Sequence, residues 1–92
     1  MVALFTVESV IPIDKKILLL EGKAEGEIKA GMSYKIPFNR SFGMTVNIDN
    51  VVKLNGNTIQ LQTNFSDEEE FKFVFSMNIG HEIFEIYDKR TI

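Results

Sequence analysis

Cysteine and tryptophan are absent from this sequence of 92 residues, and histidine occurs only once. Without cysteine the chain can form no disulfide, no thiolate metal site and no cysteine nucleophile. A single histidine also excludes a metal site built on a pair of histidines. His81 could act as a general base beside Glu82 or Glu85, but we expect it to be a surface residue at the start of a strand.

Long apolar runs and clustered basic residues are also missing. The longest apolar runs, such as residues 17–20, are too short to cross a bilayer, and the N-terminus has no secretory signal, so we expect a cytoplasmic protein. The ten lysines and arginines are scattered, and thirteen acidic residues bring the net charge to −3. Because nucleic-acid binders usually present a basic face, this balance argues against that class of protein.

Apolar residues make up 45% of the chain and include eight phenylalanines, which suits a globular protein with a dense core. The length suits one domain over residues 1–92. Apolar and polar residues alternate through most of the sequence with the two-residue period of a half-buried strand. We expect the first strand to be bent or bulged near Pro12 and the fourth to carry a β-bulge at 49–50. The predicted strands are 5–13, 17–25, 32–38, 44–54, 58–65 and 82–87.

Residues 67–77 carry signals of both a helix and a strand. Ser66, with Glu69 three residues later, forms a capping box, and the acidic residues that follow favour a helix N-terminus. Alternating phenylalanines favour a strand instead. We prefer a helix that begins at Ser66 or Asp67, and the strand stays open as the alternative. The buried side of the helix would carry Phe71, Val74, Phe75 and Met77.

Several short strands with at most one helix predict an all-β protein. Asn55-Gly56 is the strongest hairpin signal, since both residues tolerate the positive φ of a type I′ turn. We predict a small, closed, Greek-key-like barrel of about six strands, with the helix across one opening. Its interior should contain eight aliphatic residues: Val7, Ile28, Ile36, Val46, Ile48, Ile59, Leu61 and Ile83.

Three segments resemble the second domain of translation elongation factor Tu and related translation factors. Residues 7–13 (Val-Glu-Ser-Val-Ile-Pro-Ile) resemble the opening of that domain, and residues 24–31 (Ala-Glu-Gly-Glu-Ile-Lys-Ala-Gly), followed by a short strand to Ile36, resemble its next hairpin. Residues 79–86 resemble its closing strand. The resemblance implies a freestanding barrel of that type. The family's Gly-Arg-Gly after the first strand is replaced by residues 14–16, and no Gly-x-x-x-x-Gly-Lys-Ser/Thr loop occurs, so only the fold is transferred.

Two clusters and one loop are candidates for binding. The four acidic residues at 67–70 could hold a cation, but they lack the spacing of a calcium loop, and a solvated helix start is preferred. The phenylalanines at 71, 73 and 75 could stack on bases, but only Lys72 lies among them, and core packing is preferred. Arg40 and Phe42, in the loop 39–43, pair a cation with an aromatic ring and are our candidate partner contact.

No catalytic, cofactor-binding or metal-binding residue is predicted, because no nucleophile, base and oxyanion donor are recognisable together. We expect no enzyme activity and no cofactor. The favoured function is a protein-interaction module with an unidentified protein partner. The alternative, implied by the resemblance, is a translation-associated module that binds RNA or the ribosome. A third hypothesis is a small enzyme whose site forms by oligomerisation.

Overall fold

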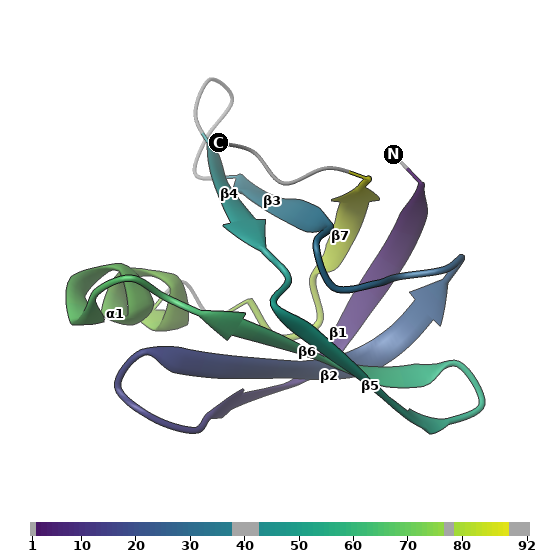
Figure 1. Cartoon of the computed structure of the whole chain (residues 1–92), viewed down its shortest axis with the longest axis horizontal. Coiled ribbons are helices and arrows are strands. Elements are labelled where there is room, and N and C mark those ends of the chain that lie inside the picture. The colour runs from purple at the N-terminus through teal and green to yellow at the C-terminus, as the bar shows by residue number, and fades with distance from the viewer. Residues whose placement is uncertain (1, 38–42, 77–78, 89–92) are drawn as a thin grey trace.

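The computed structural model describes residues 2–37, 43–76 and 79–88 (Figure 1). The described strands form one antiparallel sheet in the order β4-β3-β7-β1-β2-β6-β5, curled into a half-barrel. The prediction of a mostly β protein with one short helix is confirmed, and the prediction of a closed six-stranded barrel is wrong. The elements are β1 (Ala3–Pro12), β2 (Ile17–Glu25), β3 (Ser33–Pro37), β4 (Gly43–Asn47), β5 (Asn50–Asn55), β6 (Thr58–Asn64), α1 (Glu68–Ser76) and β7 (Ile83–Tyr87).

The predicted fourth strand, residues 44–54, is two strands because the chain changes partner at Asp49. The Ile48 amide donates to the Met32 carbonyl at 2.8 Å, whereas the Asp49 amide donates to the Gln62 carbonyl at 2.8 Å. As a result β4 pairs with β3, and β5 pairs with β6. The two strands diverge from this corner as the edges of the sheet (Figure 1). The break in the apolar–polar alternation at residues 49–50, from which we predicted a bulge, lies at this corner.

A β-bulge in β1 changes which side chains face the core. The register with β2 shifts between Val7 and Ser9, which leaves Glu8 as the extra residue. Val7 is therefore buried, Ser9 is exposed, and Val10 packs against the core. The bend or bulge was predicted near Pro12, and the structure has the bulge at Glu8 instead.

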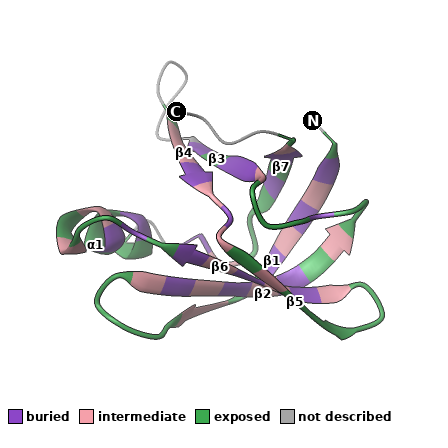
Figure 2. Ribbon diagram, in the orientation of Figure 1, coloured by how far each residue is buried: buried purple, intermediate pink, exposed green. Residues whose placement is uncertain are grey.

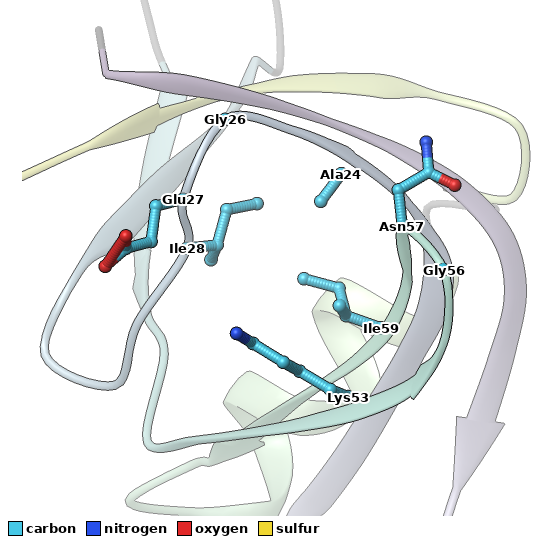
Figure 3. Close-up of a pocket in the computed structure, with 8 residues that line it drawn as sticks. All are labelled: Ala24, Gly26, Glu27, Ile28, Lys53, Gly56, Asn57 and Ile59. Carbon is cyan, nitrogen blue, oxygen red and sulfur yellow. The ribbon is translucent and has the colours of Figure 1, made fainter.

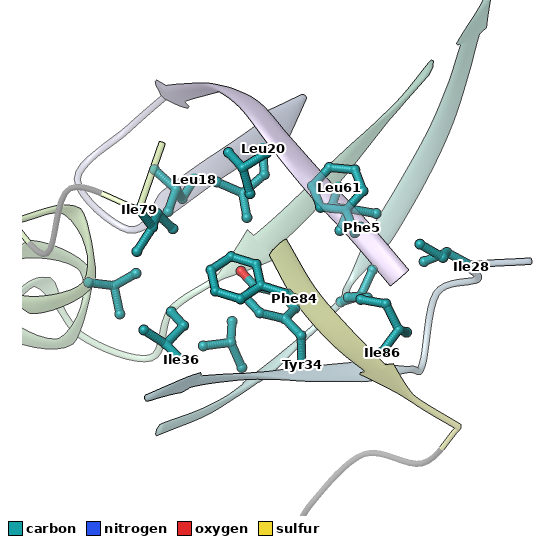
Figure 4. Close-up of a cluster of buried hydrophobic side chains, with 14 of the residues drawn as sticks. Phe5, Leu18, Leu20, Ile28, Tyr34, Ile36, Leu61, Ile79, Phe84 and Ile86 are labelled. Carbon is teal, nitrogen blue, oxygen red and sulfur yellow. The ribbon is translucent and has the colours of Figure 1, made fainter. Parts of the chain in front are cut away.

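One hydrophobic cluster fills the inside of the curled sheet (Figure 4). Buried and less buried residues alternate along the strands (Figure 2). Ile83 is 62% exposed, so its predicted interior position is wrong. The reason is that β7 turns Phe84 and Ile86 inward, where the Phe84 ring stacks on Tyr34 with centroids 5.0 Å apart. The other predicted interior residues are all buried: Val7, Ile28, Ile36, Val46, Ile48, Ile59 and Leu61.

Tyr34 is fully buried, and this burial raises its pKa, an effect that the nearby Thr63 hydroxyl partly offsets. Thr63 donates its own hydrogen bond to the Asn47 carbonyl at 2.9 Å. The Tyr34 hydroxyl has no well-formed hydrogen bond within the described part of the chain, because its contact with Thr63 lacks the geometry of one. The neutral phenol is therefore strongly favoured in the folded state.

We expect the free energy of unfolding to fall as the pH rises above about 10, the pKa of tyrosine in an unfolded chain. Because the folded pKa lies above the unfolded one, the stabilisation is complete below pH 10 and is lost at higher pH, by up to about 1.4 kcal/mol per pH unit. In Tyr34→Phe, the free energy of unfolding measured with urea should not show this loss above pH 10. The pKa of Tyr87 is also raised, by its hydrogen bond to Glu85, but by less, so Tyr87→Phe should keep the larger loss of stability that comes from Tyr34. Equal pH profiles for the wild type and Tyr34→Phe would contradict the assignment.

The β5–β6 hairpin turns one residue later than predicted. Asn55 pairs with Thr58, so the two turn residues are Gly56 and Asn57. Gly56 has a φ of 58°, and among the described residues of this turn it alone has a positive φ. This is the pattern of a type II′ turn, which takes glycine first. The predicted hairpin is confirmed, and the predicted type I′ turn is wrong.

The helix α1 also begins one residue later than its predicted capping box. The Asp67 carboxylate accepts the Glu70 amide at 2.7 Å, and the Asp67 carbonyl accepts the Phe71 amide at 3.3 Å. Asp67 is therefore the N-cap. Ser66 donates its hydroxyl to the Glu70 carboxylate at 3.3 Å. The preferred helix is confirmed, and the assignment of the cap to Ser66 is wrong.

Replacing Asp67 with alanine should lower the free energy of unfolding by about 1 kcal/mol, because the Glu70 amide loses its acceptor. Replacing Ser66 with alanine removes only an exposed contact and should cost less than about 0.5 kcal/mol. Urea unfolding of the two variants measures the difference. An equal or larger loss of stability in Ser66→Ala would show that Ser66 is the N-cap.

Candidate functional site

The sequence candidates for a site fall into three groups. Arg40 and Phe42, the candidate partner contact, lie outside the described residues, so that prediction stays open. The acidic segment belongs to the start of α1, where Glu68 lies 3.7 Å from Lys15 and 3.9 Å from Lys72. Residues 2–37, 43–76 and 79–88 contain no group of three or more histidine or acidic side chains that could hold a metal ion.

The three phenylalanines of α1 do not form one stacking platform. Phe71 is buried and meets the Phe65 ring edge-on, with centroids 5.9 Å apart. Phe75 was predicted to be buried but is 44% exposed, and it stacks on Phe71 at 5.9 Å. Phe73 is 52% exposed. Core packing is therefore confirmed for Phe71 and wrong for the other two; Met77 lies outside the described residues.

His81 is exposed, as predicted, and lies in the turn before β7 with a φ of 70°. Histidine is one of the few residues that adopt this left-handed region with some frequency. The His81 amide donates to the Val7 carbonyl at 2.9 Å, and the Val7 amide donates to the Glu82 carbonyl at 2.8 Å. The backbone of this turn therefore holds β1 beside its bulge.

Ile83 belongs to an apolar strip on the outer face of the sheet. In the β1–β7 ladder, Thr6 lies opposite Ile83 and Leu4 lies opposite Glu85, and opposite residues direct their side chains to the same face. Ile83 is 62% exposed and Val2 is 49% exposed, so the strip reaches water. The apolar residues of this outer strip are Val2, Leu4, Ile83 and Tyr87, and Thr6 and Glu85 lie among them on the same face.

A hollow of about 380 Å³ adjoins the outer strip. β3 pairs with β7 at only two positions, and Lys35, the next residue of β3, lines the hollow. Ile83 and Tyr87 line it together with Lys35, Glu82 and Glu85, so acidic groups outnumber basic ones at its rim. The Tyr87 hydroxyl donates to the Glu85 carboxylate at 2.8 Å, and this hydrogen bond raises the pKa of Tyr87.

A second cavity, of about 330 Å³, lies between the β2–β3 loop and the β5–β6 hairpin (Figure 3). These two loops lie at the end of the half-barrel away from α1 (Figure 1). We call this cavity the mouth pocket. Lys53 extends into it from β5, whereas the Glu27 carboxylate points away (Figure 3). Glu27 pairs with Lys29 at 2.7 Å, and this contact lowers the pKa of Glu27. The apolar floor of the pocket is formed by Ala24, Ile28 and Ile59.

Comparisons with protein-family models, with curated proteins and with solved structures find no match for this chain. The resemblance of residues 7–13, 24–31 and 79–86 to a translation-factor domain therefore stays a prediction. No helix in the described part of the chain is long and apolar enough to cross a membrane.

Sequence reasoning missed both the outer strip and the mouth pocket. The strip combines Leu4 with Ile83, which are distant in the sequence and become diagonal neighbours on the outer face only through the β1–β7 ladder. One signal was present: Ile83 and Tyr87 alternate with Glu85 on the face of β7 opposite to Phe84, so both faces of this strand carry large apolar side chains. Such a strand can bury only one face unless a second surface covers the other.

Proposed function

We propose that this chain is a non-catalytic module that binds a protein partner through the outer strip. The observation that carries the proposal is the 62% exposure of Ile83 on a strand whose other face, with Phe84 and Ile86, is in the core. Full burial of such a side chain is worth about 1.5–3 kcal/mol. Contiguous exposed apolar patches with polar rims are typical of protein–protein contacts.

The charges around the hollow indicate the chemistry of the partner. Glu82 and Glu85 face a single lysine, Lys35, among the residues that line it. A partner segment with a lysine or arginine next to an apolar side chain would complement this rim, because opposite charges favour encounter and fix the register of binding. We therefore expect the partner to insert an apolar side chain beside Ile83 and to place a basic group near the two glutamates.

The RNA- or ribosome-binding alternative has less support from the charges. Lys15, Lys29 and Lys72 each lie within 4.0 Å of a glutamate, which reduces the positive potential that they offer to phosphates. The first turn of α1 carries three glutamates, so the helix N-terminus repels an anion rather than attracting it. The resemblance to translation factors remains the support for this alternative.

Peptide selection tests the proposed function. Panning random peptides of about 12 residues against the protein should recover sequences that combine apolar and basic residues, and these should bind Ile83→Ser at least tenfold more weakly than the wild type. Ile13→Ser is the matched control, because Ile13 is 57% exposed and lies just past the far end of β1. Selected peptides that lose affinity equally for both variants, or for neither, would refute the role of the outer strip.

A further inference from the structure

We infer that the mouth pocket is a binding site for the carboxylate of a small aliphatic ligand, and that Lys53 recognises this carboxylate. The mouth pocket lies at the end of the β5–β6 ladder opposite to the corner at Asp49. Binding there does not depend on the outer strip. Three observations carry the inference: the inward direction of Lys53, the absence, among the described residues, of an ion pair within 4.0 Å of its ammonium group, and the cavity with an apolar floor in front of it.

Lys53 faces the inside of the half-barrel although it lies on an edge strand. It pairs with Ile59, whose side chain is only 6% exposed, and opposite residues share a face of the sheet. Val51, two residues earlier on the same face, packs against the core. A lysine in this position lays its methylene groups along apolar surface and keeps its ammonium group at the water boundary. Figure 3 shows the Lys53 nitrogen on the side of the pocket next to Ile28.

The Lys53 ammonium group forms no ion pair within 4.0 Å in the described residues, where each such pair involves another lysine, and it interacts with Glu27 only at longer range. Glu27, which also lines the pocket, is instead bound to Lys29 at 2.7 Å. An inward lysine on an edge strand can also serve to prevent pairing with a strand of another molecule. That role requires only the charge of the lysine and does not explain why a cavity lies in front of it. The cavity in front of this charge points to a ligand.

The floor and size of the pocket set the class of ligand. Ile28 and Ile59 are 5% and 6% exposed, so the floor is firmly packed and apolar. A volume of about 330 Å³ lies at the lower end of the range for small-molecule sites. A short branched aliphatic group would fill the floor while its carboxylate meets Lys53. A free short-chain acid and the C-terminus of a peptide that ends in leucine present this same chemistry.

Methyl NMR of the full chain tests the site with 4-methylpentanoate as the probe and 4-methylpentanamide as the uncharged control. The acid should shift the methyl signals of Ile28 and Ile59 in a saturable way, with a dissociation constant in the millimolar range expected for so small a ligand. Lys53→Met should weaken binding about tenfold, since it removes a charge-assisted hydrogen bond. Lys16→Met, in the exposed β1–β2 turn, should leave it unchanged.

Equal binding of the acid and the amide, unchanged affinity in Lys53→Met, or shifts confined to other parts of the protein would overturn the inference. A short peptide that ends in leucine with a free carboxylate separates the two sources of the ligand. Tighter binding of this peptide than of 4-methylpentanoate would identify a chain terminus, and tighter binding of the acid would identify a free acid; either result supports the site. Loss of peptide binding at the outer strip in Ile83→Ser has no bearing on these measurements.

Discussion

Replacing Gly22 with alanine should lower the free energy of unfolding by about 3 kcal/mol or more, the upper end of the range for overpacked cores. A Cβ atom at this buried position would overlap the Thr6 carbonyl oxygen and approach the Glu8 nitrogen to 3.1 Å. Both atoms belong to the backbone of β1 beside its bulge, so no rotation of a side chain can relieve the overlap. The β1–β2 ladder would have to separate at this point.

Gly80→Ala is the matched control for this prediction. A Cβ atom there has nothing within 4 Å, so the stability should change by no more than about 0.5 kcal/mol. Urea unfolding of the two variants provides the comparison. Wild-type stability for Gly22→Ala would show that the bulge of β1 does not pack against β2 in the way described.

Replacing Phe5 with alanine should cost about 3–5 kcal/mol. Phe5 is completely buried and lies between Ala24 of β2 and Phe84 of β7. Because strands on both sides fix the backbone around it, the sheet cannot collapse into the space that the ring leaves. A domain has only about 5–15 kcal/mol of stability in total, so this variant should be close to unfolding at room temperature.

Phe5→Leu keeps most of the volume and should cost roughly 1–1.5 kcal/mol. Both variants can be measured by urea unfolding with the wild-type m-value as the check on two-state behaviour. A loss below about 1 kcal/mol for Phe5→Ala would mean that this cluster is not the core of the fold.

The positions of the strands could be predicted because alternation is a local property of the sequence. The predicted strand 17–25 coincides with β2, and the predicted strands 58–65 and 82–87 differ from β6 and β7 by one residue each. The helix could be predicted for the same reason, because the signal for its start lies in a few consecutive residues. The N-cap is Asp67 and not Ser66. The sequence did not decide between them, because both neighbouring residues are of a type that can serve as an N-cap.

The half-barrel shape of the sheet and the face that β7 turns to the core could not be predicted, because both depend on pairing with residues that are distant in the sequence. Residue 49 turns to β6 through a hydrogen bond to Gln62, and no pattern within 44–54 specifies that partner. Both faces of β7 carry apolar residues, so alternation alone left Ile83 and Phe84 as equal choices for the core. The β1–β7 register buries Phe84 opposite Phe5 and places Ile83 opposite Thr6 on the outer face, diagonal to Leu4.

The choice between a protein partner and an RNA partner is tested most directly by NMR titration of the labelled protein at about 0.1 M salt, where screening removes weak long-range attraction. We predict that a peptide selected against the protein shifts the signals of Ile83 and Tyr87, whereas tRNA and single-stranded RNA leave the spectrum unchanged. Ribosomes, tested by co-sedimentation under the same conditions, should not retain the protein. Tight, salt-dependent binding to any of these RNAs or to ribosomes would contradict the account and favour the translation-associated alternative.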